Sequence, residues 1–192
     1  MKNIMHIALA ALAIAVLPQL ALAAPANYTL QPEASTVGFE TDFGPDKITG
    51  RMPVTAATLT LDFQNVAGSS VAVTLDVAHA EASFPFAAQA MRGPKVLDAQ
   101  EFPTISFKST SVKADGDGAA VQGNITIRGV TRPAALHAVI FRQQGSADGD
   151  LSHLTIHLTG AVARSDFGAV GWADMVGDQV RLDILARIVR VN

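Results

Sequence analysis

The side chains best suited to chemistry in this sequence are His79 and Glu81, which are two residues apart. His79 continues the apolar phase of an alternating run that ends at Val77. A histidine and a carboxylate near the mouth of a barrel could act as a base or bind a polar head group. We favour the simpler interpretation, a strand-end histidine that makes one hydrogen bond, because a catalytic role requires a demonstrated geometry.

Two other patterns are better explained by structure than by chemistry. His153 and His157 are four residues apart, which on a strand is roughly 13 Å, too far for one metal ion. Ser165 and Asp166 lie in the segment 164–168, but neighbouring strand residues point to opposite faces and no nucleophile-elbow motif is present. We interpret this segment as a turn in which Arg164 and Asp166 share a face and pair. We therefore expect no catalytic residue and no metal site.

Strands must position these side chains, because apolar and polar residues alternate through most of the sequence from Thr29 onward. This pattern is typical of antiparallel sheets with one buried face. The glycine-rich segment 115–118 predicts a tight hairpin turn. We expect about eight strands and a short extra one near Tyr28. The clearest alternating runs are residues 58–63, 71–77, 105–108, 121–128, 154–159 and 180–188.

The sequence predicts an all-β fold, either a sandwich or an antiparallel barrel. Alternation stops between Glu81 and Leu97, where apolar residues follow helical spacing until Gly93, so we expect one or two short helices over the barrel or its mouth. A barrel of about eight strands is either filled by side chains or holds one small ligand. Small residues in the apolar phase suggest a cavity, although strand glycines also mark bends. These residues are Thr41, Gly123, Ala138, Gly160 and Ala186.

The first 23 residues have the features of a secretory signal peptide. Lys2 precedes an apolar run, and Ala21-Leu22-Ala23 forms a small-x-small cleavage site. We expect a mature domain, residues 24–192, without a stable membrane span. Its formal net charge changes from −3 to −4 when Lys2, the only charged residue of the segment, is removed. A mildly acidic domain has no electrostatic footprint for nucleic acid, and the absence of cysteine excludes thiol chemistry.

Three segments carry a resemblance to a known family. They are EFPTISFKST (residues 101–110), GNITIRGVTRP (123–133) and RSDFG (164–168), in this order. Together with STVGF (35–39) near the start, they resemble the YceI-like family over nearly the whole mature chain. This resemblance implies a lipocalin-like barrel with a long apolar channel that binds polyisoprenoid chains, in periplasmic and often stress-associated proteins. It implies no catalytic residue and no cofactor other than a bound isoprenoid lipid.

The aromatic residues provide the expected contacts for such a ligand. In the sequence they fall in the buried phase or near strand ends and the helical break. We expect the apolar tail to contact Phe39, Phe63, Phe84, Phe86, Phe107 and Trp172. We expect any head group to be bound by His79, Glu81 and Arg92.

Departures from the family pattern limit the choice of ligand. Asp42 stands where a histidine is common, residues 87–90 replace an Arg-Asp-x-His motif, and Val96 replaces an aromatic residue. A diphosphate requires arginine or lysine, so a neutral quinone fits better.

Two alternative functions remain: a ligand-free secreted barrel that acts through its surface, and a small enzyme that uses His79 and Glu81. A homodimer also remains possible. An outer-membrane barrel would require girdles of aromatic residues, which one Trp and one Tyr do not provide.

Overall fold

The computed structural model describes residues 24–191, so the signal peptide predicted for residues 1–23 lies outside the described residues. The described part of the chain forms one antiparallel sheet of eleven strands. The strands are β1 (Ala26–Leu30), β2 (Thr36–Phe43), β3 (Asp46–Met52), β4 (Val54–Leu61), β5 (Ser70–Asp76), β6 (Glu81–Ala82), β7 (Thr104–Asp115), β8 (Gly118–Ile127), β9 (Val130–Arg142), β10 (His153–Ala163) and β11 (Val176–Arg190). The helix α1 is Pro85–Arg92, and the 3₁₀ turns are η1 (Pro32–Ala34), η2 (Val66–Gly68) and η3 (Arg164–Phe167).

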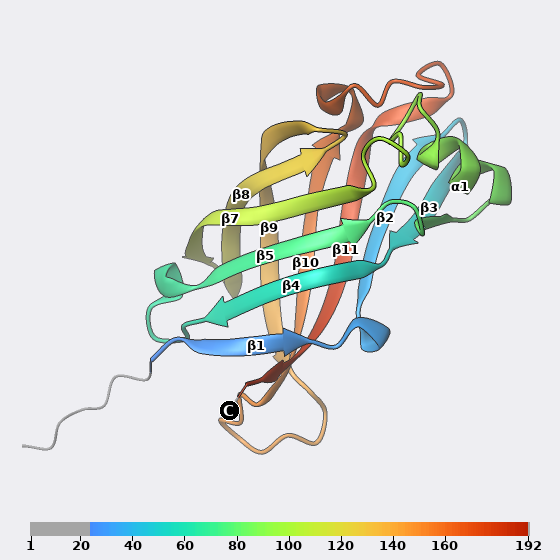
Figure 1. Cartoon of the computed structure of the whole chain (residues 1–192). Helices are drawn as coiled ribbons and strands as arrows, with labels where there is room; N and C mark the ends of the chain where they lie inside the picture. Colours follow the sequence, from blue (N-terminus) through green and yellow to red (C-terminus); the bar gives the residue numbers. More distant parts are fainter. Residues whose placement is uncertain (1–23, 192) are drawn as a thin grey trace, which may run out of the picture.

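Eight of these strands close into a barrel (Figure 1). The order is β1-β4-β5-β7-β8-β9-β10-β11, and β1 pairs with the end of β11 to complete the ring. Because β11 has fifteen residues, its earlier part can also pair with β2, from which β3 and β6 continue. The predicted antiparallel barrel of about eight strands is therefore confirmed, and the sandwich alternative is wrong.

Short turns fix the register of the barrel. The predicted hairpin turn joins β7 to β8, and its Gly116 has a φ of 59°, which glycine adopts without steric cost. The β8–β9 turn similarly places Gly129 at a φ of 72°. These tight connections keep sequential strands antiparallel and adjacent.

The inward phase of each strand forms the core. On β10, Leu154 and Ile156 are buried, and on β11 Ile188 is buried. One group of buried residues centres on Leu154 and Ile188, and a second centres on Val77, Ile105 and Phe167. The alternation in the sequence therefore assigned the inner face of these strands correctly.

The two ends of the barrel differ (Figure 1). One end carries α1 and the loop between η3 and β11, whereas the other carries the β4–β5, β7–β8 and β9–β10 connections. Pro85 begins α1, where a missing N–H is tolerated, and Gly93 follows its last residue. One of the predicted short helices is thus present, and its Ala87 is buried against the barrel. No helix within residues 24–191 is long and apolar enough to cross a bilayer.

Candidate ligand-binding cavity

The barrel encloses an apolar cavity of about 850 Å³. Its wall includes Phe86 and Trp172 at the α1 end and Gly118 at the β7–β8 turn, so the cavity extends between the two ends of the barrel. The middle of the wall is formed by inward residues such as Val73 and Leu182. A cavity of this size and lining is suited to an elongated apolar molecule.

Five of the six aromatic residues expected to contact a ligand line this cavity. They are Phe39, Phe63, Phe86, Phe107 and Trp172. Phe84 does not line the cavity; its ring stacks on that of Phe86, with 6.0 Å between the centroids. Phe84 immediately precedes α1 and is exposed. We therefore keep five of these side chains as candidate contacts.

Two of these aromatic rings pack directly against glycine residues. A Cβ atom added at Gly123 would meet the ring of Phe107 and lie 2.6 Å from the backbone oxygen of Lys108. Gly50 is covered in the same way by the ring of Phe39 on the neighbouring strand. The interpretation that Gly123 leaves open space is therefore wrong. This glycine lets an aromatic ring lie flat against the barrel wall.

The three head-group candidates do not line the cavity. His79 Nδ1 lies 2.7 Å from the Asp76 carboxylate in an exposed turn, and this hydrogen bond lowers the pKa of Asp76. Glu81 pairs with Arg51, whose guanidinium lowers the pKa of Glu81. Because β5 ends at Asp76, the turn that follows rotates His79 out of the inward phase predicted from the alternation.

Arg92 is also directed away from the cavity. Its Nε donates to the carbonyl oxygen of Ala88, and its Nη1 donates to that of Ala78. It lines a small surface cleft beside the end of α1 instead of the main cavity. The expected head-group site of His79, Glu81 and Arg92 is therefore not assembled.

Sequence reasoning missed the role of Arg164, a buried residue that lines the cavity. Burial lowers the pKa of its guanidinium, which donates hydrogen bonds to four backbone carbonyls. The signal was present in the sequence, because Arg164 continues the inward phase of Ile156 and Val162. The acceptors are Ala169 (2.6 Å), Gly171 (2.8 Å), Val176 (2.9 Å) and Gly177 (2.9 Å).

The segment that contains Arg164 is a turn, as predicted. It forms η3, and Gly168 follows it with a φ of 71°. The predicted pair between Arg164 and Asp166 is wrong, because the guanidinium turns inward to the loop carbonyls. Ser165 instead bonds to Asp178 through both its backbone N–H and its hydroxyl group.

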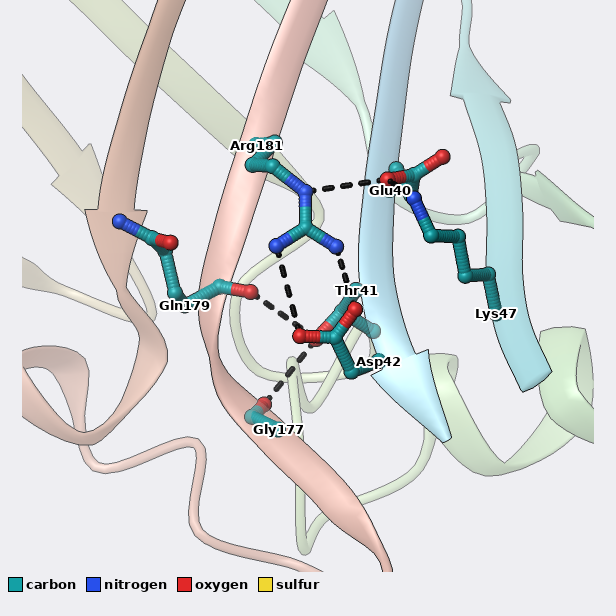
Figure 2. Close-up of polar contacts among 7 residues, drawn as sticks. All are labelled: Glu40, Thr41, Asp42, Lys47, Gly177, Gln179 and Arg181. Carbon is teal, nitrogen blue, oxygen red and sulfur yellow. Dashed lines mark hydrogen bonds and ion pairs between the residues drawn. The ribbon is translucent and has the colours of Figure 1, made fainter. Parts of the chain in front are cut away.

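Asp42 belongs to an ion network on the outer face (Figure 2). Arg181 on β11 pairs with Asp42 and with Glu40 on β2, and Lys47 pairs with Glu40. Between these carboxylates, Thr41 points inward and its hydroxyl group lies 3.0 Å from two carbonyl oxygens of β11. The network therefore joins strands and does not face the cavity.

The two histidines of β10 are not arranged as metal ligands. His157 Nε2 lies 2.8 Å from Asp183, and His153 Nδ1 lies 2.9 Å from the hydroxyl group of Ser152. Within the part of the chain that the structure describes, no group of three potential ligands could hold a metal ion.

The geometry defines a class of protein: a closed antiparallel barrel around an apolar cavity, as in lipocalins. A family model described as a YceI-like domain matches residues 28–188. The chain belongs to the YceI-like family. The resemblance found in the sequence motifs is thus confirmed.

Curated relatives match over a shorter segment. The proteins called Protein YceI of Salmonella arizonae and Salmonella newport are each 34% identical over 86 residues. This segment is 45% of this chain and 45% of each relative. The match therefore spans about half the length of these curated relatives.

Solved structures share the fold. BcnA of Burkholderia cenocepacia superposes with a TM-score of 0.74 at 20% identity, covering 83% of this chain and 99% of BcnA. A polyisoprenoid-binding domain from Saccharophagus degradans, described as implicated in plant cell wall breakdown, superposes with a TM-score of 0.59. It is 12% identical, and the match covers 85% of this chain and 98% of that domain. At these identities the likeness concerns the fold alone.

Proposed function

We propose that this protein binds an isoprenoid-like lipid with an uncharged head group, such as a quinone, inside the barrel. The observation that carries the proposal is the apolar cavity of about 850 Å³ that extends between the two ends. Membership of the YceI-like family and the fold shared with a polyisoprenoid-binding domain support it. Burial of the tail contributes affinity in rough proportion to its apolar area.

The charges around the cavity favour an uncharged head group. Among the described residues, Arg142 and Arg164 are the only cationic side chains in its wall. The Arg164 guanidinium donates to four carbonyls, and Arg142 pairs with Asp148. A diphosphate would require arginine or lysine donors directed at it.

The arrangement of titratable groups gives less support to an enzyme. His79 pairs with Asp76, whereas Glu81 pairs with Arg51 on another strand. A base and an acid that act together must lie within hydrogen-bond reach of one reacting group. We therefore propose a binding protein, with no catalytic residue and no cofactor other than the lipid.

Two alanines on β4 allow a matched test of the cavity. Ala57 lines the cavity, whereas its neighbour Ala56 is exposed. Delipidated protein should bind a long-tailed quinone, and Ala57→Phe should weaken binding at least about tenfold because the new ring occupies space needed by the tail. Ala56→Phe should bind like the wild type. Titration with the quinone and with a polyprenyl diphosphate measures both effects.

Several outcomes would contradict this proposal. Tighter binding of the diphosphate than of the quinone would show that the head group is charged. Equal loss in Ala57→Phe and Ala56→Phe would show that the cavity is not the site. If neither compound binds, and if mass spectrometry finds no lipid in extracts of natively purified protein, the alternative of a ligand-free barrel that acts through its surface replaces this one.

We also propose that the protein is periplasmic after cleavage of residues 1–23. The support is the Lys2-led apolar run and the Ala21-Leu22-Ala23 site. Sequencing of exported protein should begin within a residue or two of Ala24. An intact N-terminus on membrane-bound protein would contradict the proposal.

A further inference from the structure

Exposed apolar side chains gather at one end of the barrel. Ten large apolar residues are exposed within residues 24–191, and half of them flank the α1 end. Phe86, in α1, is 64% exposed, and Val170, in the loop between η3 and β11, is 56% exposed. We call this set the apolar rim; it consists of Phe84, Phe86, Val170, Trp172 and Met175.

Hydrogen bonds hold the segments of the apolar rim together. The N–H of Gly171 donates to the carbonyl oxygen of Lys95 at 2.8 Å, and Lys95 Nζ lies 5.8 Å from the centre of the Trp172 ring. Arg128 Nη1 donates to the carbonyl oxygens of Val96 and Gly168. The segment after α1 and the loop before β11 are thereby fixed side by side.

The apolar rim is continuous with the cavity. Phe86, Trp172 and Met175 belong to the rim and also line the cavity. The carbonyl oxygen of Met175 accepts a hydrogen bond from Gly44 at the β2–β3 turn, which brings this turn to the same end. An apolar molecule that entered or left here would cross water unless another apolar phase covered the rim.

We propose that the apolar rim docks on the surface of a phospholipid bilayer and so joins the cavity to the acyl region. This inference rests on the proposed function, because a lipid ligand must move between a membrane and the cavity. Tryptophan is enriched at the membrane–water interface, and segments that lie in this interface combine Trp and Phe with lysine. A bilayer fits better than a protein surface, because residues of the apolar rim also line the cavity and an apolar tail can pass from the acyl region into it only if that region covers the rim.

The charges indicate which bilayer is recognised. Lys47 and Lys95 lie near this end with Asp46 and Asp174. The guanidinium groups of Arg92 and Arg128 are also near, but they donate to backbone carbonyls, so no basic cluster is directed at a bilayer. The whole sequence has a formal net charge of −3. Anionic lipids attract polybasic segments, which this end does not provide. Docking should therefore depend on apolar contact, proceed on zwitterionic phosphatidylcholine and change little with salt.

Trp172 is the only tryptophan of the chain, so its fluorescence reports on the apolar rim directly. Delipidated protein should cosediment with phosphatidylcholine vesicles that contain no isoprenoid. Its emission should shift to shorter wavelength and be quenched by lipids brominated on the acyl chain. Failure of both signals at high lipid concentration would overturn the docking proposal.

A matched pair of valines separates docking from ligand binding. Val170 belongs to the apolar rim but does not line the cavity, and Val191 is similarly exposed, at 51%, near the far C-terminal end (Figure 1). Val170→Asp should weaken vesicle binding at least about tenfold, because it places a charge where docking would bury the apolar Val170 side chain in the bilayer. Val191→Asp should bind vesicles like the wild type. Both variants should bind a quinone supplied in detergent like the wild type.

Other outcomes would overturn the proposal in distinguishable ways. Binding only to phosphatidylglycerol vesicles, lost at high salt, would indicate electrostatic attraction instead of apolar docking. A dimer that Val170→Asp converts to monomer, measured by light scattering, would indicate that a second copy covers the apolar rim. If the protein binds vesicles but no quinone, the proposed function fails and the docking proposal stands. If the protein binds quinone but no vesicles, the docking proposal fails and the proposed function stands.

Discussion

A single buried arginine organises one end of the barrel. Arg164 begins η3 directly after β10 and occupies an inward position, where an apolar residue would normally lie. Its Nε, Nη1 and Nη2 atoms reach four carbonyl oxygens of the loop before β11 and of the start of β11. Buried carbonyl groups without hydrogen-bond partners are costly. The Arg164 side chain therefore stabilises the loop that carries Trp172 by donating hydrogen bonds to its carbonyl oxygens.

We expect Arg164→Leu to lower the free energy of unfolding by about 2–5 kcal/mol, since several buried carbonyls lose their donor. Urea denaturation, followed by the fluorescence of Trp172, measures the change. Arg187→Leu is the control, because Arg187 is exposed on β11, and it should change stability by less than about 0.5 kcal/mol. Similar stability of the two variants would show that the carbonyls find other partners.

At the scale of elements, β11 connects the parts of the fold. It pairs with β10 along its length, with β1 near its end and with β2 before that. The register to β2 shifts between Val176 and Val180, and the Thr41 hydroxyl group lies against this irregularity from inside. On the outer face, Arg181 joins β11 to Glu40 and Asp42 of β2 (Figure 2).

The ion network between β2 and β11 predicts a pH dependence. Arg181 lowers the pKa of Asp42, and Lys47 followed by Arg181 lowers the pKa of Glu40. The folded pKa values of Asp42 and Glu40 lie below their ordinary values of 3.8 and 4.5. Both carboxylates therefore stabilise the fold fully at a pH above these ordinary values. This contribution is lost as the pH falls through the lowered folded pKa values.

Arg181→Gln should therefore raise the pKa of Asp42 clearly and that of Glu40 less, since Lys47 remains beside Glu40. The variant should also lose less stability on acidification than the wild type. NMR titration of the carboxyl groups measures the pKa values, and Asp76, whose pKa is lowered by His79, is the internal control. An unchanged pKa of Asp42 would refute the role of Arg181.

At the scale of the whole molecule, the barrel encloses a cavity that is lined almost entirely by apolar side chains. Within residues 24–191, each buried side-chain nitrogen or oxygen atom has a hydrogen-bond partner. The buried polar groups of the wall, such as Thr41 and Arg164, are thus satisfied by the protein itself. A ligand in the cavity would gain mainly from apolar contact, and its affinity should grow with the length of its tail.

A long-tailed quinone at about 100 times its Kd should stabilise the protein by about 2.7 kcal/mol, because it binds the folded state alone. For a domain of this size, the melting temperature should rise by roughly 5–10 °C. A quinone with the same head group and no tail should produce little shift. Equal shifts from both compounds in a thermal melt would place the affinity in the head group and contradict the apolar mechanism.

The sequence by itself determined the antiparallel strands, their inner faces, the β7–β8 turn and the helical break. Alternation and turn residues are local signals, because strand period and glycine conformation depend on neighbouring residues. The same signals placed Phe39 and Phe107 inside correctly. The family motifs in residues 101–133 and 164–168 were recognisable for the same reason.

Only the tertiary structure decided how the side chains meet. His79 continued an inward phase, but the turn after β5 directs it to Asp76 in solvent. Arg164 took its partners from a loop that is held by hydrogen bonds to Lys95 and Arg128, residues distant in the sequence, which no local pattern encodes. The closure of the barrel by β1 and β11 joins residues near opposite ends of the domain. Such contacts form because the whole ring must bury its apolar face, and the pairing that achieves this is a property of the assembled sheet.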